Sequence, residues 1–330
     1  MRIEAFSEGK YLDDPDANED QFLVLPGLGF AVIDGVTDIS GRVYDGMRSG
    51  RLASSIIQQA TAAFLVDGSS AEPRAEALID RASAALAAAY RRHGIFDEAR
   101  TDPARRFGAT LTIAIDLGRS FRFILVGDSG LRLNGNEVIN ADDGLDRVTA
   151  ALRQEAYRQV ALAGGDLAAQ RKVSRACSFY GAATLHPDME PWIDTTRLAE
   201  LYQRSFDRCD ELFPRAPDAD IRCLLDRGIS GQCRFQNNLQ SPFSYSVLDG
   251  FDVPMPLVRV FDRPRHALRS IELFTDGYFR HGATTQLATW EAAFREAERI
   301  DPEKIDAYPS VKGSTDRMRT DDRTIVIVRL

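Results

Sequence analysis

The chain has 330 residues, of which 44% are hydrophobic and 27% charged, a balance that is typical of a globular protein with a sizeable core. The formal net charge of −8 argues against broad binding to nucleic acid, which requires a clustered basic surface. Neither a signal peptide nor a run of about 18 apolar residues is visible. We therefore expect a cytoplasmic protein with no nucleic-acid or membrane partner.

Two hairpins and two helices are predicted in the first 130 residues. Apolar runs separated by turn-forming residues, such as Pro26 to Gly29, indicate the hairpins. Apolar residues at helical spacing indicate a helix from Val43 to about Val66 and another from Ala71 to Arg92. The near-continuous apolar character of the strands indicates a sheet that is covered on both faces. The paired strands are Phe22 to Leu25 with Phe30 to Ile33, and Thr110 to Ile115 with Phe121 to Val126.

The chain changes character between about residues 141 and 255. Alternating charges and Ala, Leu and Arg predict helices there, roughly Leu145 to Ala163 and Thr195 to Phe213, and the polar stretch from Gly228 to Ser241 predicts a loose segment. Strand patterns then resume, so we expect a single domain over 1–330 with a largely helical insertion at about 141–255. The later elements are strands at Leu257 to Phe261, Ile271 to Phe274 and Thr324 to Val328, and a helix at Thr284 to Arg299.

Four apolar strands each carry an Asp at one end. Asp34, Asp128 and Asp276 follow strands, and Asp321 precedes the last one. An Asp-Gly pair alone is a common turn dipeptide. An ionised carboxylate removed from water, however, costs several kcal/mol unless it is paired or binds a metal. No Arg or Lys adjoins Asp34 or Asp276 in sequence, so the recurrence favours a divalent metal.

Six short elements occur in a fixed order along the chain. They are Asn18-Glu19-Asp20, Asp34-Gly35, Gly108-Ala109-Thr110, Gly127-Asp128-Ser129, Asp276-Gly277 and Asp321-Asp322. This series resembles the metal-dependent protein phosphatases of type 2C, the PPM family, in which N-E-D, D-G, G-x-T, G-D-S, D-G and D-N follow one another. The segment from Ser49 to Ser54 resembles bacterial members. The match reaches both ends of the chain and leaves only the insertion uncovered, as in a divergent bacterial-type member.

The resemblance implies an α+β fold, a four-layer α-β-β-α sandwich of two antiparallel sheets flanked by helices. By analogy Asp34 would bridge two metal ions and the Gly35 carbonyl would ligate one of them. Asp276 and Asp321 would complete the other shell, and Asp128 would bind a third, weaker metal. Glu19 and Asp20 would act through metal-bound water. Asp34 and Asp276 would thus be the catalytic residues of metal-water activation.

The residue types agree with that chemistry. Oxygen-only ligands select hard cations such as Mn²⁺ or Mg²⁺. Two such ions lower the pKa of a bound water and clamp a phosphoryl group for direct attack, so that no protein nucleophile is required. The resemblance therefore implies hydrolysis of phosphate monoesters, with phosphoserine or phosphothreonine proteins as the expected substrates.

Departures from the family pattern leave an alternative open. Pro15 stands where the family commonly has a phosphate-binding Arg, and Lys10 is a candidate substitute. Val36 replaces a residue that is often His in eukaryotic members, and Asp322 replaces the Asn of the final D-N. The substrate-binding residues are therefore unknown at this point. The alternative is a catalytically silent pseudophosphatase that serves as a protein-binding or regulatory module.

Overall fold

The computed structural model describes residues 1–36, 41–68, 73–140 and 144–330. The chain divides into two compact units, which we describe separately. The first comprises Met1–Ala141, Tyr245–Glu296 and Arg317–Leu330, and the second Asp142–Ser244 and Ala297–Asp316. Within the described ranges, every helix is too short or too polar to cross a lipid bilayer. The single domain with an insertion stays a prediction.

The first unit contains a five-stranded sheet in which all neighbours are antiparallel. Both predicted hairpins are confirmed, and Gly27, with φ of +82°, lies in the turn of the first. A positive φ is a conformation that glycine adopts at little cost. In sheet order the strands are β12 (Arg259–Pro264), β9 (Ser120–Val126), β8 (Leu111–Asp116), β3 (Gly29–Ile33) and β2 (Gln21–Leu25).

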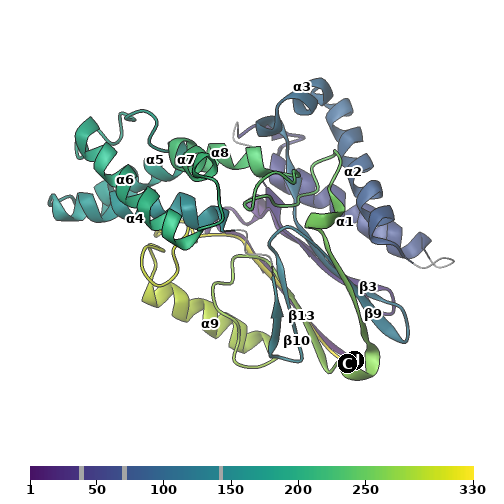
Figure 1. Cartoon of the computed structure of the whole chain (residues 1–330). Coiled ribbons are helices and arrows are strands. Elements are labelled where there is room, and N and C mark those ends of the chain that lie inside the picture. The colour runs from purple at the N-terminus through teal and green to yellow at the C-terminus, as the bar shows by residue number, and fades with distance from the viewer. Residues whose placement is uncertain (37–40, 69–72, 141–143) are drawn as a thin grey trace. The chain divides into compact units, whose positions relative to one another are not determined.

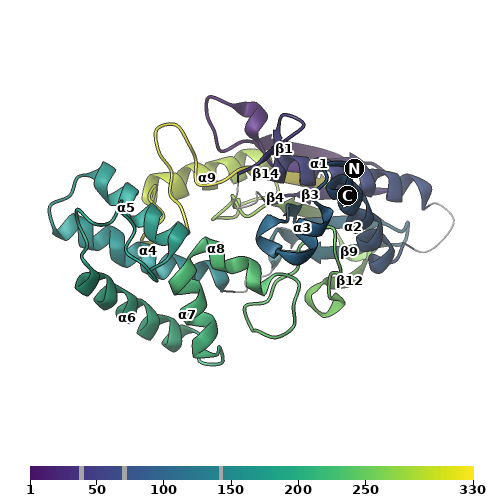
Figure 2. The same cartoon turned by 90° about the horizontal axis from the view of Figure 1, so that it is seen from above.

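The second sheet of this unit brings the two ends of the chain together. The first and last strands pair antiparallel, with Arg2 opposite Arg329 and Glu8 opposite Arg323, and Figure 2 shows them side by side. The predicted strands at 271–274 and 324–328 are confirmed as neighbours. In sheet order the strands are β1 (Arg2–Glu8), β14 (Arg323–Arg329), β13 (Ser270–Phe274), β10 (Gly130–Leu133) and β11 (Glu137–Ile139).

Alternate side chains of β3 divide between two apolar layers. Phe30 and Val32 belong to a core that includes Leu273 and Val326 of the second sheet, so the two sheets pack face to face. Ala31 and Ile33 point the other way, into a core shared with the helices α1 (Ser49–Asp67) and α2 (Ala75–Arg92). Successive strand residues face opposite sides, which is why a fully buried strand requires both layers.

A helix covers the outer face of the second sheet. Trp290 and Phe294 of α9 (Leu287–Ile300) pack against Phe274, Ile325 and Ile327. Figure 1 shows α9 on the side of β10 and β13, and α1 and α2 on the side of β3 and β9. The first unit is therefore a helix, sheet, sheet, helix sandwich, and the predicted α+β fold of two antiparallel sheets is confirmed.

Short elements connect these layers, and one of them corrects a prediction. Residues 43–48 form a hairpin instead of the first turns of a helix, because Asp45 and Gly46 both have positive φ, as a tight hairpin turn requires. The predicted second helix begins at Ala75, and its first two predicted residues lie outside the described ranges. The short elements are β4 (Gly35–Val36) paired with β7 (Gly108–Ala109), β5 (Val43–Tyr44) paired with β6 (Met47–Arg48), and α3 (Phe96–Thr101).

Tyr90 connects α2 to the strand region through two buried hydrogen bonds. Its hydroxyl donates to the Phe107 carbonyl at 2.6 Å and accepts from the Phe107 amide at 2.9 Å. Tyr90→Phe leaves both backbone groups buried without these partners, so we expect a loss of about 1–3 kcal/mol in the free energy of unfolding. Chemical unfolding followed by circular dichroism measures it. Tyr180→Phe, at a tyrosine that is 51% exposed, is the control, and an equal loss in both variants would contradict the prediction.

The second unit is helical, as predicted for the insertion. Arg153 of its first helix donates to the carbonyls of Glu303, Lys304 and Ser310 and so holds the 297–316 segment within this unit. The helices at 145 and 195 begin where the sequence predicts them. The elements are α4 (Leu145–Leu162), α5 (Leu167–Tyr180), α6 (Thr195–Leu212), α7 (Asp218–Arg227) and α8 (Ile229–Gln232).

The prediction of a loose segment at Gly228 to Ser241 is wrong for its first half. This stretch begins with α8 and continues as a 3-10 helix from Cys233 to Phe235. Phe235 is buried, and its ring lies 6.1 Å from that of the buried Phe243. Although the segment is polar in composition, the buried contact of Phe235 with Phe243 holds it in place.

Candidate functional site

Five Asp side chains of the first unit act on one another electrostatically, and we call Asp20, Asp34, Asp128, Asp276 and Asp321 the acidic cluster. Burial raises the pKa of Asp34 well above its ordinary value, and the charges of the other four raise it further. The four carboxyl groups are therefore within electrostatic reach of Asp34. The cluster extends from the buried Asp20 through the half-buried Asp34 and Asp321 to the exposed Asp128 and Asp276.

The antiparallel register of the strands places these Asp residues at neighbouring strand ends. Phe274 at the end of β13 is opposite Ile325 near the start of β14, so Asp276 and Asp321 flank one edge of the second sheet. Asp34 follows β3 directly, and its carbonyl accepts a hydrogen bond from the amide of Thr110 at 2.9 Å. The edge therefore gathers residues that are almost 290 positions apart in sequence.

The glycines of the two Asp-Gly pairs permit close packing of backbones. A Cβ at Gly35 would lie 2.4 Å from the Gly50 carbonyl oxygen and 2.7 Å from that of Glu19. A Cβ at Gly277 would lie 2.1 Å from the Asp322 carbonyl oxygen. Neither distance leaves room for a side chain. The pairs thus bring the N-terminus of α1 and the start of β14 against the acidic strand ends.

Asp20 is the most buried member of the cluster, with 2% of its surface exposed. Its Oδ2 accepts a hydrogen bond from the Thr275 hydroxyl at 2.8 Å, and that hydroxyl accepts from the Thr324 amide at 2.9 Å. Its buried Oδ1 has no hydrogen-bond partner among the described residues. Burial, followed by the charge of Asp322, raises the pKa of Asp20 to about 7. A buried carboxylate oxygen without a donor favours a cation as its partner.

The Lys10 ammonium lies among three carboxylates, those of Glu19, Asp321 and Asp322. The ammonium contacts Glu19 Oε2 at 2.7 Å, Asp322 Oδ2 at 2.9 Å and Asp321 Oδ1 at 3.6 Å, and the Lys10 backbone amide donates to Asp322 Oδ1 at 2.7 Å. Burial lowers the pKa of Lys10, but the charges of Asp321, Asp322 and Glu19 outweigh that effect and raise the pKa well above its ordinary range. The ammonium therefore stays charged.

The G-x-T and G-D-S elements contact each other directly. The Thr110 and Ser129 hydroxyls are 2.8 Å apart, and Gly127, with φ of +89°, donates its amide to the Ser246 hydroxyl at 3.0 Å. These contacts fix the backbone on either side of Asp128. The exposed carboxylate of Asp128 thus projects from a rigid turn at the end of β9.

The structure narrows which basic side chain of this region could bind an anion from solution. Pro15 begins a short 3-10 helix, Pro15–Ala17, and Lys10 is only 9% exposed and surrounded by carboxylates. Arg48 was not singled out by sequence. Its guanidinium lies 4.5 Å from the centroid of the Tyr11 ring and donates to the Tyr11 hydroxyl at 2.8 Å. This hydrogen bond, and more weakly the charge of Glu19, raises the pKa of Arg48, so Arg48 is a half-exposed cation on which Glu19 acts electrostatically.

The donor chemistry of the cluster fits a hard divalent cation, since every side chain supplies oxygen. The partnerless Oδ1 of Asp20 and the mutual repulsion around Asp34 fit it as well. In the ranges that the structure describes, however, no three His, Cys, Asp or Glu side chains are arranged to hold one ion. Glu19 and Asp322 instead face the Lys10 ammonium.

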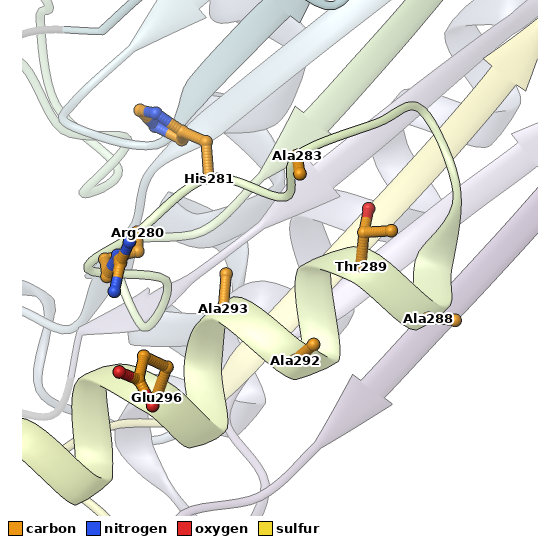
Figure 3. A pocket seen from close by; sticks show the side chains of 8 residues that line it. All are labelled: Arg280, His281, Ala283, Ala288, Thr289, Ala292, Ala293 and Glu296. Atoms are coloured by element: carbon orange, nitrogen blue, oxygen red, sulfur yellow. The ribbon is translucent and has the colours of Figure 1, made fainter.

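A cavity of about 480 Å³ lies between the 280–283 segment and α9. Figure 3 shows four alanines among its lining residues, with Arg280 and Glu296 toward one end. No member of the acidic cluster lines it. Its walls consist largely of small apolar side chains, which are not ligands for a divalent ion. The lining residues are Arg280, His281, Ala283, Ala288, Thr289, Ala292, Ala293 and Glu296.

Comparisons with known proteins give fold likeness at low identity. No protein-family model matches the chain, and no curated protein matches it significantly. Among solved structures, it is similar to the serine/threonine phosphatase PstP/Ppp of Mycobacterium tuberculosis, with 15% identity, a TM-score of 0.46 and coverage of 100% of this chain and 98% of that chain. It is also similar to the serine/threonine phosphatase Stp1 of Staphylococcus aureus, with 13% identity, a TM-score of 0.47 and coverage of 100% and 95%. A structure of the PstP catalytic domain with two manganese ions gives 14% identity, a TM-score of 0.44 and coverage of 99% and 96%. At TM-scores below 0.5 we draw no functional conclusion from these likenesses.

Proposed function

We propose that this chain is a divergent member of the type 2C family and a metal-dependent phosphatase that hydrolyses phosphate monoesters. Phosphoserine and phosphothreonine residues of proteins are the proposed substrates, and Mn²⁺ or Mg²⁺ the proposed cofactors. The observation that carries the proposal is the position of Asp34, whose pKa is raised by burial and by four further carboxylates from separate strand ends. Repulsion between carboxylates destabilises the fold, so a purely structural role does not explain it. Carboxyl groups with shifted pKa values are typical of functional sites.

The roles of the residues follow from their positions. Asp34, Asp276 and Asp321 would hold divalent ions, with the Gly35 carbonyl as a further ligand and Asp128 as the ligand of a third, weaker ion. When bound, such ions lower the pKa of a water ligand and neutralise phosphoryl oxygens. Asp20, whose Oδ1 is free to accept, would orient water next to them. The number of ions, two or three by resemblance, stays a prediction.

The direct test is turnover of p-nitrophenyl phosphate and of a phosphothreonine peptide. We expect hydrolysis with Mn²⁺ and none with EDTA, because the proposed nucleophile is a water that ionises near neutral pH only when a divalent ion binds it. A second addition of Mn²⁺ in excess of EDTA should restore the rate. Absence of turnover with Mn²⁺ and with Mg²⁺ would reject the enzyme and favour the pseudophosphatase.

The pseudophosphatase remains the second candidate because the family's phosphate-binding Arg is replaced by Pro15. The same sandwich would then serve as a module that binds a protein partner. The exposed Asp276 and Asp128 argue for the enzyme, since carboxylates at a solvent-facing edge are accessible to ions and substrate. We also propose that the helices between about 141 and 255 are an insertion in one phosphatase-like domain.

Arg48 is the residue that we propose for substrate phosphate. Its stacking on Tyr11 limits its rotamers, so a phosphate contact would cost little further side-chain entropy. Arg48→Ala should raise KM for p-nitrophenyl phosphate about 10- to 100-fold, since a charge-assisted hydrogen bond contributes about 1.5–3 kcal/mol. Steady-state kinetics measure it. Arg81→Ala, at a partly exposed Arg of α2, is the control, and an unchanged KM in Arg48→Ala would contradict the assignment.

A further inference from the structure

The Lys10 ammonium is enclosed by three acidic side chains, and the family resemblance gives other roles to two of them, Glu19 and Asp321. Glu19 and Asp322 are each 2% exposed, and their nearest oxygens lie 2.7 and 2.9 Å from the Lys10 Nζ. Asp321 is at 3.6 Å. Lys10 itself is 9% exposed and is further fixed by its backbone, which donates to Asp322 Oδ1 and accepts from the Arg319 amide at 2.8 Å.

This arrangement divides the acidic residues into two groups. Glu19 and Asp322 direct oxygens at the ammonium, which donates to both. Among the described residues no ammonium or guanidinium contacts Asp20: the Thr275 hydroxyl donates to its Oδ2, and its buried Oδ1 lacks a partner. Asp321 stands between the groups, because it approaches Lys10 and its charge also acts on Asp34. One side of the site is therefore neutralised by the chain and the other is not.

We infer that Lys10 is a built-in counter-cation that occupies the Glu19–Asp322 side of the site, so that divalent ions bind only on the Asp20–Asp34 side. A divalent ion takes carboxylate oxygens at about 2.0–2.2 Å, and beside these two oxygens it would meet a fixed ammonium of the same sign. The ammonium is tied through both its side chain and its backbone. The inference rests on the proposed metal dependence and confines the bound ions to the Asp20–Asp34 side of the site.

The test counts bound metal without using activity. Wild-type protein and Lys10→Met, which keeps the length of the side chain and removes its charge, are dialysed against a range of Mn²⁺ concentrations, and bound manganese is measured by mass spectrometry. We expect Lys10→Met to bind one Mn²⁺ per chain more than the wild type. Lys172→Met, at an exposed lysine that is 2.9 Å from Asp188, is the matched control and should bind as the wild type does.

Equal numbers of Mn²⁺ in wild type and Lys10→Met would overturn the inference. If Lys10→Met does not fold, Asp322→Asn in the presence of Lys10 replaces it. The inference requires that variant to bind as many ions as the wild type, and loss of an ion would overturn it. Because the readout is a count of ions, a chain that binds Mn²⁺ as expected but hydrolyses nothing would reject the proposed function and leave the inference standing.

Discussion

Asp34→Asn should reduce Mn²⁺-dependent hydrolysis of p-nitrophenyl phosphate to the background rate while the protein stays folded. Asn keeps the shape of the side chain and removes the negative charge that is surrounded by Asp20, Asp276, Asp321 and Asp128. Removing one preorganised electrostatic contact at a reacting centre typically costs about 10²–10³ in kcat. Asp34 is proposed to serve more than one ion, so the loss should lie at or above the upper end of that range.

Asp276→Asn should produce a comparable loss of activity for the same reason. Asp34→Asn relieves repulsion around a half-buried carboxylate, so its melting temperature without metal should equal or exceed that of the wild type. Asp210→Asn, at an exposed Asp of α6, is the control and should retain full activity. Full activity in Asp34→Asn or Asp276→Asn would reject the assignment of these residues.

The elements that sequence predicted well are those whose signals are local. The hairpins around Gly27 and Gly118 follow from turn residues between apolar runs, and both strand pairs form. The starts of α4 and α6 agree with the predicted ones. The first helix was extended too far back because Val43 and Met47 fit a helical period, whereas Asp45 and Gly46 turn the chain into a hairpin.

The candidate site could be predicted only where its residues lie at the ends of predicted strands. Each Asp of the cluster adjoins an apolar strand, and this pattern is legible without a structure. The contacts of Lys10 were not, because its partner Asp322 is 312 residues away and the two meet only through the pairing of β1 with β14. The expectation of a metal as counter-charge considered only the sequence neighbours of Asp34 and Asp276, and so it did not reveal Lys10 beside Asp321 and Asp322. Arg48 was missed for a related reason, since its contact with Tyr11 spans 37 residues.

Removing divalent metal should lower the melting temperature, and the effect should grow with pH. In the folded, metal-free chain the pKa of Asp20 is raised from 3.8 to about 7 by burial and then by Asp322. Between pH 3.8 and about pH 7 the folded chain keeps a proton on Asp20 that the unfolded chain has lost. The contribution of Asp20 to the free energy of unfolding is therefore greatest near pH 3.8 and falls as the pH rises towards about 7. At 1.36 kcal/mol per pKa unit the decline amounts to at most about 4 kcal/mol.

Metal binding should offset this decline, because ions bound only by the native state stabilise it by about 2.7 kcal/mol at a concentration 100 times Kd. Thermal scans with Mn²⁺ or with EDTA should therefore differ by several degrees near pH 8 and by less near pH 5.5, where Asp20 retains a proton that a metal must displace. Asp20→Asn removes the titrating carboxyl group. Its melting temperature in EDTA should therefore depend less on pH than that of the wild type. Equal shifts of the melting temperature by Mn²⁺ at both pH values would contradict a metal site built on carboxyl groups whose pKa is raised. If Asp20→Asn keeps the pH dependence of the wild type, that dependence belongs to other groups.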